Sequence, residues 1–161
     1  LEVLMKRVDE MVRVTNNNDL AVAAAKCSAA VLFEILNGKS MESALIGSLE
    51  FAGGKLRPLL EQVLAIQTLD NIRVAEQFGS ACHVTEGLPV VFHIAKCAPD
   101  YKTAIEANIR TGGDSCGRAI MLGSFTAAYM VKQGESTFPI PLEWLVRYRK
   151  IIAATDACTN F

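Results

Sequence analysis

The sequence lacks the features that mark several common classes of protein. Its 161 residues carry a net charge of −1 and contain no basic cluster, which argues against nucleic acid or an anionic membrane as the main partner. The apolar runs are far too short to span a bilayer, and no signal-peptide pattern opens the chain. We therefore expect neither a nucleic-acid-binding protein nor a membrane protein.

Cysteine patterns are also missing. The five cysteines are an odd number at irregular spacing, with no Cys-x-x-Cys pair, so neither a disulfide framework nor a zinc ribbon is indicated. No Asn-x-Ser/Thr glycosylation site occurs. These absences favour a cytoplasmic protein with reduced thiols. We expect Cys27 and Cys97 to lie in the core, together with His93 among its apolar neighbours.

What the sequence does contain is helical periodicity. Hydrophobic residues make up 51% of the chain and charged residues 20%, which is typical of a globular protein. Apolar residues recur at helical spacing, and no stretch shows the alternation of a strand. We predict a single all-α domain over residues 1–161, with an Ala-rich, centrally packed helix over 21–36. The other helices are expected over 1–14, 41–51, 55–67, 71–77, 88–96, 101–110 and about 115–132, with a last helix after Pro141.

Two connections deserve a functional interpretation. Residues 78–87 read as a loop of some ten residues, longer than usual, and such loops are often functional. Gly112 and Gly113 predict a sharp turn before the next helix, with Asp114 or Ser115 as its N-cap. A carboxylate beside bare glycine backbone could instead hold a cation or meet a phosphate. From these residues alone, the simple cap is the preferred interpretation.

Several landmarks, taken in order, resemble the C-terminal part of the ADP-ribosylglycohydrolase family. They are Val14-Thr15-Asn16-Asn17, Phe78-Gly79-Ser80-Ala81-Cys82 with Gly87-Leu88-Pro89, Ala104-Ile105-Glu106-Ala107-Asn108 with Gly112-Gly113-Asp114, and Ile140-Pro141 with Trp144. The resemblance implies an all-α fold, a pair of Mg²⁺ ions, and hydrolysis of the bond between ADP-ribose and a modified protein or related acceptor. We expect this chain to lack the N-terminal half of such a domain.

The resemblance also implies roles for individual residues. It makes Asp114 a metal ligand and assigns substrate binding to Asn16, Cys82, Gly112, Gly113 and Ser115, and it identifies no catalytic residue. Two further ligand positions of the family motif fall on Cys116 and Gly117. A thiol is a poor ligand for Mg²⁺, and glycine has no side chain to offer. Asn16 stands where the family has a histidine, and an amide cannot shuttle protons near neutral pH.

Two functions therefore stay open. One is a magnesium-dependent ADP-ribosyl hydrolase, whose partner is ADP-ribose or an ADP-ribosylated protein. The other is a catalytically impaired structural or ADP-ribose-binding protein, because the Gly-Gly-Asp motif is most similar to that of the crystallin J1 and selenoprotein J branch. In this second case, Arg118 could replace a cation by an ion pair with Asp114. Cys116 could be an activated thiol at a helix start, but we expect a small buried residue instead.

Overall fold

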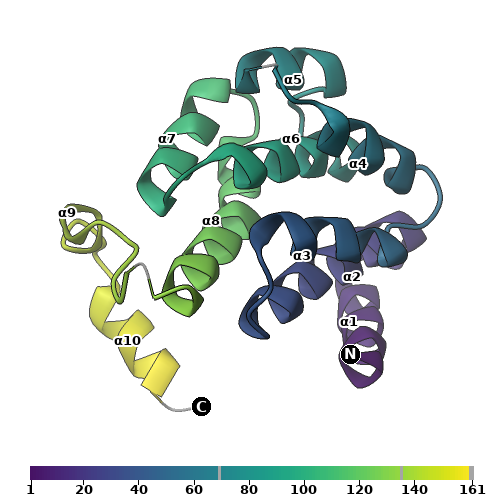
Figure 1. Ribbon diagram of the computed structural model, residues 1–161. Helices are drawn as coiled ribbons and strands as arrows, with labels where there is room; N and C mark the ends of the chain where they lie inside the picture. Colours follow the sequence, from purple (N-terminus) through teal and green to yellow (C-terminus); the bar gives the residue numbers. More distant parts are fainter. Residues whose placement is uncertain (69, 135, 160–161) are drawn as a thin grey trace.

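The computed structural model describes residues 1–68, 70–134 and 136–159, and within these ranges the chain is helical and contains no β-strand (Figure 1). The all-α prediction is thus confirmed. The helices are α1 (Glu2–Thr15), α2 (Asp19–Leu36), α3 (Met41–Ser48) followed by the short 3-10 helix η1 (Leu49–Phe51), α4 (Leu56–Ala65), α5 (Asn71–Phe78), α6 (Val84–Cys97), α7 (Tyr101–Thr111), α8 (Ser115–Lys132), α9 (Leu142–Leu145) and α10 (Ile151–Thr159).

Helix α6 is the centre of the core. It contacts α2, α3, α4, α5, α7 and α8, and it lies in the middle of the molecule in Figure 1. Every residue from Gly87 to Ala95 is buried. A helix that is apolar on all sides is stable only when other elements surround it, so its sequence demands this position. His93 lies in this run with 2% of its surface exposed, which confirms its prediction as a core residue.

The Ala-rich helix α2 is less buried than its composition suggested. It buries six of its 18 residues, whereas α6 buries nine of 14. Its small side chains let α1, α3 and α8 approach closely, but another part of its surface borders an open pocket. The prediction that α2 packs closely against its neighbours is therefore confirmed. The helix is less completely enclosed than its alanine content suggested.

Of the two C-terminal helices, α9 contacts α7 at the surface of the protein. Neither α9 nor α10 buries a residue. The ring of Trp144 lies 6.2 Å from that of Tyr101, and Lys102 Nζ is 3.6 Å from Glu143 Oε1.

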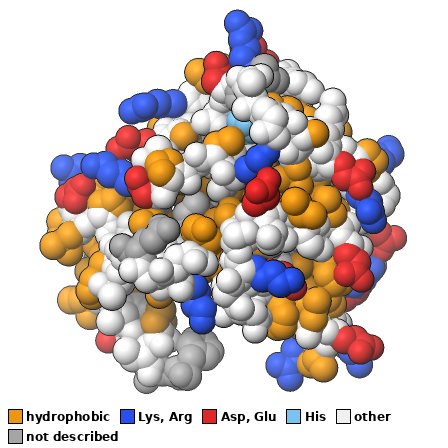
Figure 2. Space-filling model, viewed as in Figure 1, with side chains coloured by type: hydrophobic (Ala, Val, Ile, Leu, Met, Phe, Trp, Pro, Cys, Tyr) orange, Lys and Arg blue, Asp and Glu red, His pale blue; other side chains and the backbone are white. Residues whose placement is uncertain are grey.

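Figure 2 shows hydrophobic side chains exposed between charged ones on one face of the molecule. Within the described ranges, no helix has both the length and the apolar character that crossing a membrane requires.

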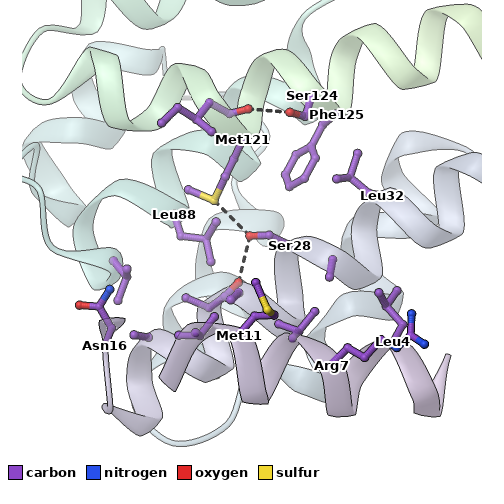
Figure 3. Close-up of a pocket in the computed structure, with 18 residues that line it drawn as sticks. Leu4, Arg7, Met11, Asn16, Ser28, Leu32, Leu88, Met121, Ser124 and Phe125 are labelled. Atoms are coloured by element: carbon purple, nitrogen blue, oxygen red, sulfur yellow. Dashed lines mark hydrogen bonds between the residues drawn. The ribbon is translucent and has the colours of Figure 1, made fainter. Parts of the chain in front are cut away.

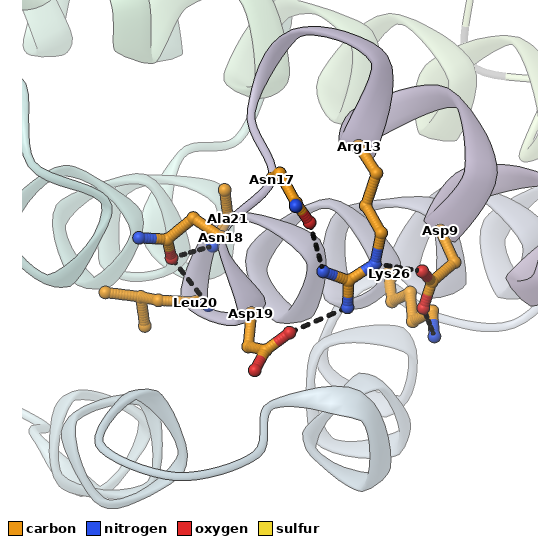
Figure 4. Close-up of polar contacts among 8 residues, drawn as sticks. All are labelled: Asp9, Arg13, Asn17, Asn18, Asp19, Leu20, Ala21 and Lys26. Atoms are coloured by element: carbon orange, nitrogen blue, oxygen red, sulfur yellow. Dashed lines mark hydrogen bonds and ion pairs between the residues drawn. The ribbon is translucent and has the colours of Figure 1, made fainter.

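A polar cluster joins α1 to α2 (Figure 4). The Asp9 carboxylate accepts hydrogen bonds from Arg13 Nε and Lys26 Nζ, both at 2.6 Å. Arg13 also donates to Asp19 at 2.7 Å, across the turn between the helices. The hydrogen bond from Lys26, followed by that from Arg13, holds the pKa of the Asp9 carboxyl below its usual range. Asp9 therefore attaches α1 in its charged form.

This cluster predicts an acid-sensitive attachment of α1. Because the pKa of Asp9 is lowered by folding, its stabilising contribution is present above the ordinary aspartate pKa and is lost as the pH falls through the lowered value. We expect Asp9→Asn to lower the urea midpoint at pH 7, and we expect its difference from the wild type to shrink progressively as the pH falls below the ordinary aspartate pKa. The neighbouring Glu10→Gln is the matched control, because the Lys6–Glu10 pair is exposed and 3.9 Å apart. Equal effects of the two variants at pH 7 would contradict this assignment.

The cysteines divide into one buried thiol and four exposed ones. Cys27 is fully buried and its Sγ lies 3.2 Å from Ser48 Oγ, and burial raises the pKa of this thiol to about 11. Cys82, Cys97, Cys116 and Cys158 are exposed, so the core prediction is confirmed for Cys27 and wrong for Cys97 and Cys116. Both errors concern cysteines near helix ends, where the chain turns towards solvent.

We therefore expect thiol labelling to separate Cys27 from the others. Only the thiolate reacts with iodoacetamide, and Cys27 combines a raised pKa with no access for the reagent. Mass spectrometry of the folded protein at pH 8 should find labels on the four exposed cysteines. Cys27 should be labelled only after denaturation. Labelling of Cys27 at the rate of Cys116 in the folded protein would show that the core is not packed as described.

Candidate functional site

The turn between α7 and α8 is built on two glycines and a capping aspartate. Gly112 and Gly113 have φ angles of 75° and 64°, in the left-handed region that favours glycine. Asp114 Oδ1 then accepts the backbone N–H of Gly117 at 3.0 Å and caps α8. A Cβ atom on Gly117 would lie 2.4 Å from Asp114 Oδ2. The prediction of a capping aspartate is confirmed, and Gly117 leaves the space that this carboxylate occupies.

A second loop, residues 79–83, lies directly against this turn. The N–H of Asp114 donates to the carbonyl oxygen of Ser80 at 2.8 Å. A Cβ atom on Gly113 would come within 2.2 Å of that same oxygen. Gly113 is therefore needed both for its backbone angle and for the close approach of the two chains. We call residues 79–83 and 112–114 together the loop pair.

The first of these loops is shorter than predicted. The sequence indicated an irregular segment over 78–87 and a helix that starts at Leu88-Pro89, but α5 continues to Phe78 and α6 begins at Val84. Glu86 lies in the first turn of α6 and its Oε2 accepts the N–H of Ala81 at 3.0 Å. This contact ties the loop to the helix start. Pro89 is thus inside α6, where a proline removes one backbone hydrogen bond and the surrounding core holds the helix together.

Arg118 connects the loop pair from inside the protein. Its side chain is the largest that is fully buried. The guanidinium donates from Nε to Asn108 Oδ1 at 2.8 Å, and from its terminal nitrogens to the carbonyl oxygens of Gly112, Asn108 and Ser80. Burial lowers the pKa of Arg118, and the negative charge of Asp114 partly opposes that effect. Among the described residues no ion pair joins Arg118 to Asp114, so that predicted pair is wrong: carbonyl oxygens hold the guanidinium instead.

The structure brings most of the predicted substrate-binding residues together. Cys82 is exposed on one loop of the pair, Gly112 and Gly113 form the other, and Ser115 is the first residue of α8. The Ser115 carbonyl accepts a hydrogen bond from Asn108 Nδ2 at 2.8 Å. The side chains of Cys82 and Cys116 are both on the surface beside these loops. Whether these residues contact a substrate stays a prediction.

Asn16 lies in different surroundings. It follows α1, its amide donates to Thr15 Oγ1 at 3.3 Å, and it borders a pocket of about 730 Å³ between α1, α2, α6 and α8 (Figure 3). Most of the residues around that pocket are apolar. The polar Ser28 beside it donates hydrogen bonds from Oγ to Ala24 O and Met121 Sδ. No hydrogen bond between described residues connects Asn16 to the loop pair. The pocket is mainly hydrophobic, and its lining includes none of residues 79–83 or 112–114.

The described residues do not fit a complete magnesium site. Mg²⁺ prefers several oxygen ligands in octahedral geometry. Here Asp114 offers one carboxylate, one oxygen of which already accepts an amide hydrogen, Cys116 offers an exposed thiol, and Gly117 offers no side chain. In the part of the chain that the structure describes, no three His, Cys, Asp or Glu side chains come together as a metal site would require.

Sequence reasoning missed Asn108 and Glu86 as parts of this arrangement. Asn108 is fully buried near the end of α7, where it bonds to both Arg118 and Ser115. A polar residue on the inward face of an amphipathic helix was the available signal, because a buried amide needs partners. Glu86 follows the loop by a few residues, the spacing of an acid in a first helical turn. The carbonyl of Ser80 left no signal, since backbone groups do not show in a sequence.

The fold and the loop pair define an all-α domain with a glycine-rich turn that is closed over a buried arginine. A family model described as ADP-ribosylglycohydrolase matches residues 1–159, and the chain belongs to that family. It is 28% identical over 141 residues to crystallin J1A of Tripedalia cystophora and 25% identical over 141 residues to crystallin J1B of the same organism. Each match covers 87% of this chain and 42% of the relative, so the chain spans less than half the length of these relatives. No solved structure matches the chain.

The closeness of the two loops gives a stability prediction. Gly113→Ala places a Cβ atom against the fixed carbonyl of Ser80, so it should cost about 1–3 kcal/mol beyond the backbone strain, as overpacking does. Gly54→Ala is the matched control: Gly54 has a similar φ of 60° and open space around it. Urea unfolding of both variants measures the difference. Equal destabilisation would show that Ser80 O does not lie against Gly113.

Proposed function

We propose that the protein containing this chain binds an ADP-ribosyl group, and that the loop pair forms part of the binding site. Membership in the ADP-ribosylglycohydrolase family supports this ligand class. The chemistry of the turn between α7 and α8 agrees with it. The free oxygen of the Asp114 carboxylate and the hydroxyl of Ser115 can accept hydrogen bonds from ribose hydroxyls. Gly112 and Gly113 allow a ligand to approach the backbone without a side chain in between.

One observation favours binding without magnesium-assisted hydrolysis. The Asp114 carboxylate is the N-cap of α8, and Gly117 provides the room that this conformation needs. With Cys116 and Gly117 at the two other motif positions, this motif contributes one carboxylate ligand at most. The similarity to two proteins named crystallin J1A and crystallin J1B is consistent with this proposal.

The second candidate is hydrolysis of ADP-ribosyl linkages, with removal of ADP-ribose from a modified protein or a related acceptor. The observation that favours it is the family match over residues 1–159, which covers nearly the whole chain. In this case Asp114 would be one Mg²⁺ ligand, and other parts of the protein would have to supply the rest. The two candidates differ in their need for the charge of Asp114.

The test uses the full-length protein and the variant Asp114→Asn. Asparagine also caps helices, so this change removes the charge and keeps α8. If the first proposal holds, calorimetry gives the same ADP-ribose affinity within about twofold in EDTA and in Mg²⁺, and Asp114→Asn weakens binding by less than about tenfold, the equivalent of one polar contact. Asp100→Asn is the control, because Asp100 caps α7 in the same way at 2.7 Å from Thr103 N.

Opposite results would support the hydrolase. Release of ADP-ribose from a peptide modified on arginine or serine, dependent on Mg²⁺ and lost in Asp114→Asn but not in Asp100→Asn, would replace the binding proposal by the second candidate. Failure of the wild-type protein to bind ADP-ribose in either buffer would refute both.

A further inference from the structure

We propose that Arg118 is the positioning residue of the loop pair: its guanidinium acts as an internal cation that arranges both loops, so the site is formed without a divalent metal. This inference rests on the proposed function for its ligand, and on the structure alone for the arrangement of the loops. It concerns how the site is held, whereas the preceding proposal concerns what the site binds.

The contacts of Arg118 reach three separate parts of the chain. Nη1 is 3.5 Å from the carbonyl oxygen of Ser80 in the first loop, and Nη2 donates to the carbonyl oxygen of Gly112 in the second. The same nitrogen is 3.5 Å from the carbonyl oxygen of Asn108, while Nε donates to the Asn108 side chain at 2.8 Å. One side chain therefore connects both loops to the end of α7.

The acceptors explain why a guanidinium is suited to this place. Arginine presents five N–H donors in a planar fork, so it can bond several oxygens in different directions at once. A lysine would offer a single point charge to the same oxygens. The acceptors bound to Arg118 are carbonyl oxygens, which are the ligands that a hard cation would also use. The positive charge of Arg118 thus offsets the partial negative charges of carbonyl oxygens that lie close together.

Asn108 extends this arrangement to the first turn of α8. Its Oδ1 accepts from Arg118 and its Nδ2 donates to the carbonyl of Ser115 at 2.8 Å. Both groups of the amide are therefore used, and the orientation of the amide is fixed by its two partners. Loss of Arg118 should loosen Ser115 as well as the two loops, because these contacts form one continuous chain of hydrogen bonds.

The Arg118 side chain is buried, so its hydrogen bonds should contribute to the stability of the two loops. Arg118 has 2% of its surface exposed, so the folded protein holds its guanidinium away from bulk water. Removal of the guanidinium would take this donor away from the half-buried carbonyl oxygens of Ser80 and Gly112. The direct hydrogen bond from Asp114 N to Ser80 O would then be the main polar contact left between the loops. We expect both loops to become mobile together.

The experiment is hydrogen exchange on the full-length protein in EDTA, read by mass spectrometry in peptides that cover 79–83 and 112–118. Arg118→Met should raise exchange by at least about tenfold in both segments together, and added Mg²⁺ should not restore it. Arg118→Lys keeps the charge and should restore protection only in part, which also covers the case in which Arg118→Met does not fold. Arg110→Met is the control, because Arg110 is exposed at the end of α7 and pairs with Glu106 at 3.5 Å.

A rescue measurement separates positioning from general stability. Methylguanidinium added to Arg118→Ala at millimolar concentration should slow exchange in both loop segments and should not affect α2. ADP-ribose affinity, measured in EDTA, should fall at least tenfold in Arg118→Met and stay unchanged in Arg110→Met.

The outcomes distinguish this inference from the proposed function. Unchanged exchange in Arg118→Met and in Arg118→Lys, or protection in the wild-type protein that requires Mg²⁺, would overturn the inference. If the loops loosen as expected and the wild-type protein binds no ADP-ribose, the positioning role of Arg118 stands and the proposed ligand is wrong.

Discussion

The arrangement of the loop pair depends on a positive charge that has been taken out of water. A buried guanidinium is unfavourable unless hydrogen bonds satisfy its donors, and here backbone carbonyl oxygens do so. These oxygens belong to segments that are far apart in the sequence, and all of them bond to the guanidinium of Arg118. The loops, the end of α7 and the start of α8 therefore adopt their positions together. Loss of one contact would leave the charge partly unsatisfied, which makes the arrangement cooperative.

Asp114 shows how a neighbouring substitution redirects a carboxylate. At position 117, glycine leaves the space that the Asp114 side chain needs in order to fold back onto the start of α8. A residue with a Cβ atom there would push the carboxylate away from the helix and leave it free for other partners. The identity of residue 117 thus influences the conformation of the Asp114 carboxylate, although glycine itself contacts nothing through a side chain.

The sequence allowed the helical fold to be predicted, together with the Gly112–Gly113 turn and the Asp114 cap, because apolar periodicity and cap residues act over a few neighbouring positions. The start of α6 was placed four residues too late, at Leu88 instead of Val84, since Pro89 is a strong local signal and the contact of Glu86 with Ala81 is not. The partners of Arg118 could not be predicted. They are mostly carbonyl oxygens, and their convergence depends on how α5, α6, α7 and α8 pack.

The contact of α9 with α7 has a consequence for spectroscopy. Trp144 is the only tryptophan of the chain, and it lies in α9, where its ring meets that of Tyr101 on α7. The core around α6 contains no indole. Intrinsic tryptophan emission therefore reports on the docking of α9 against α7, and energy transfer from Tyr101 makes it sensitive to their separation. A fluorescence transition and a circular-dichroism transition in this protein describe two different events, and they coincide only if the C-terminal helices detach when the core unfolds.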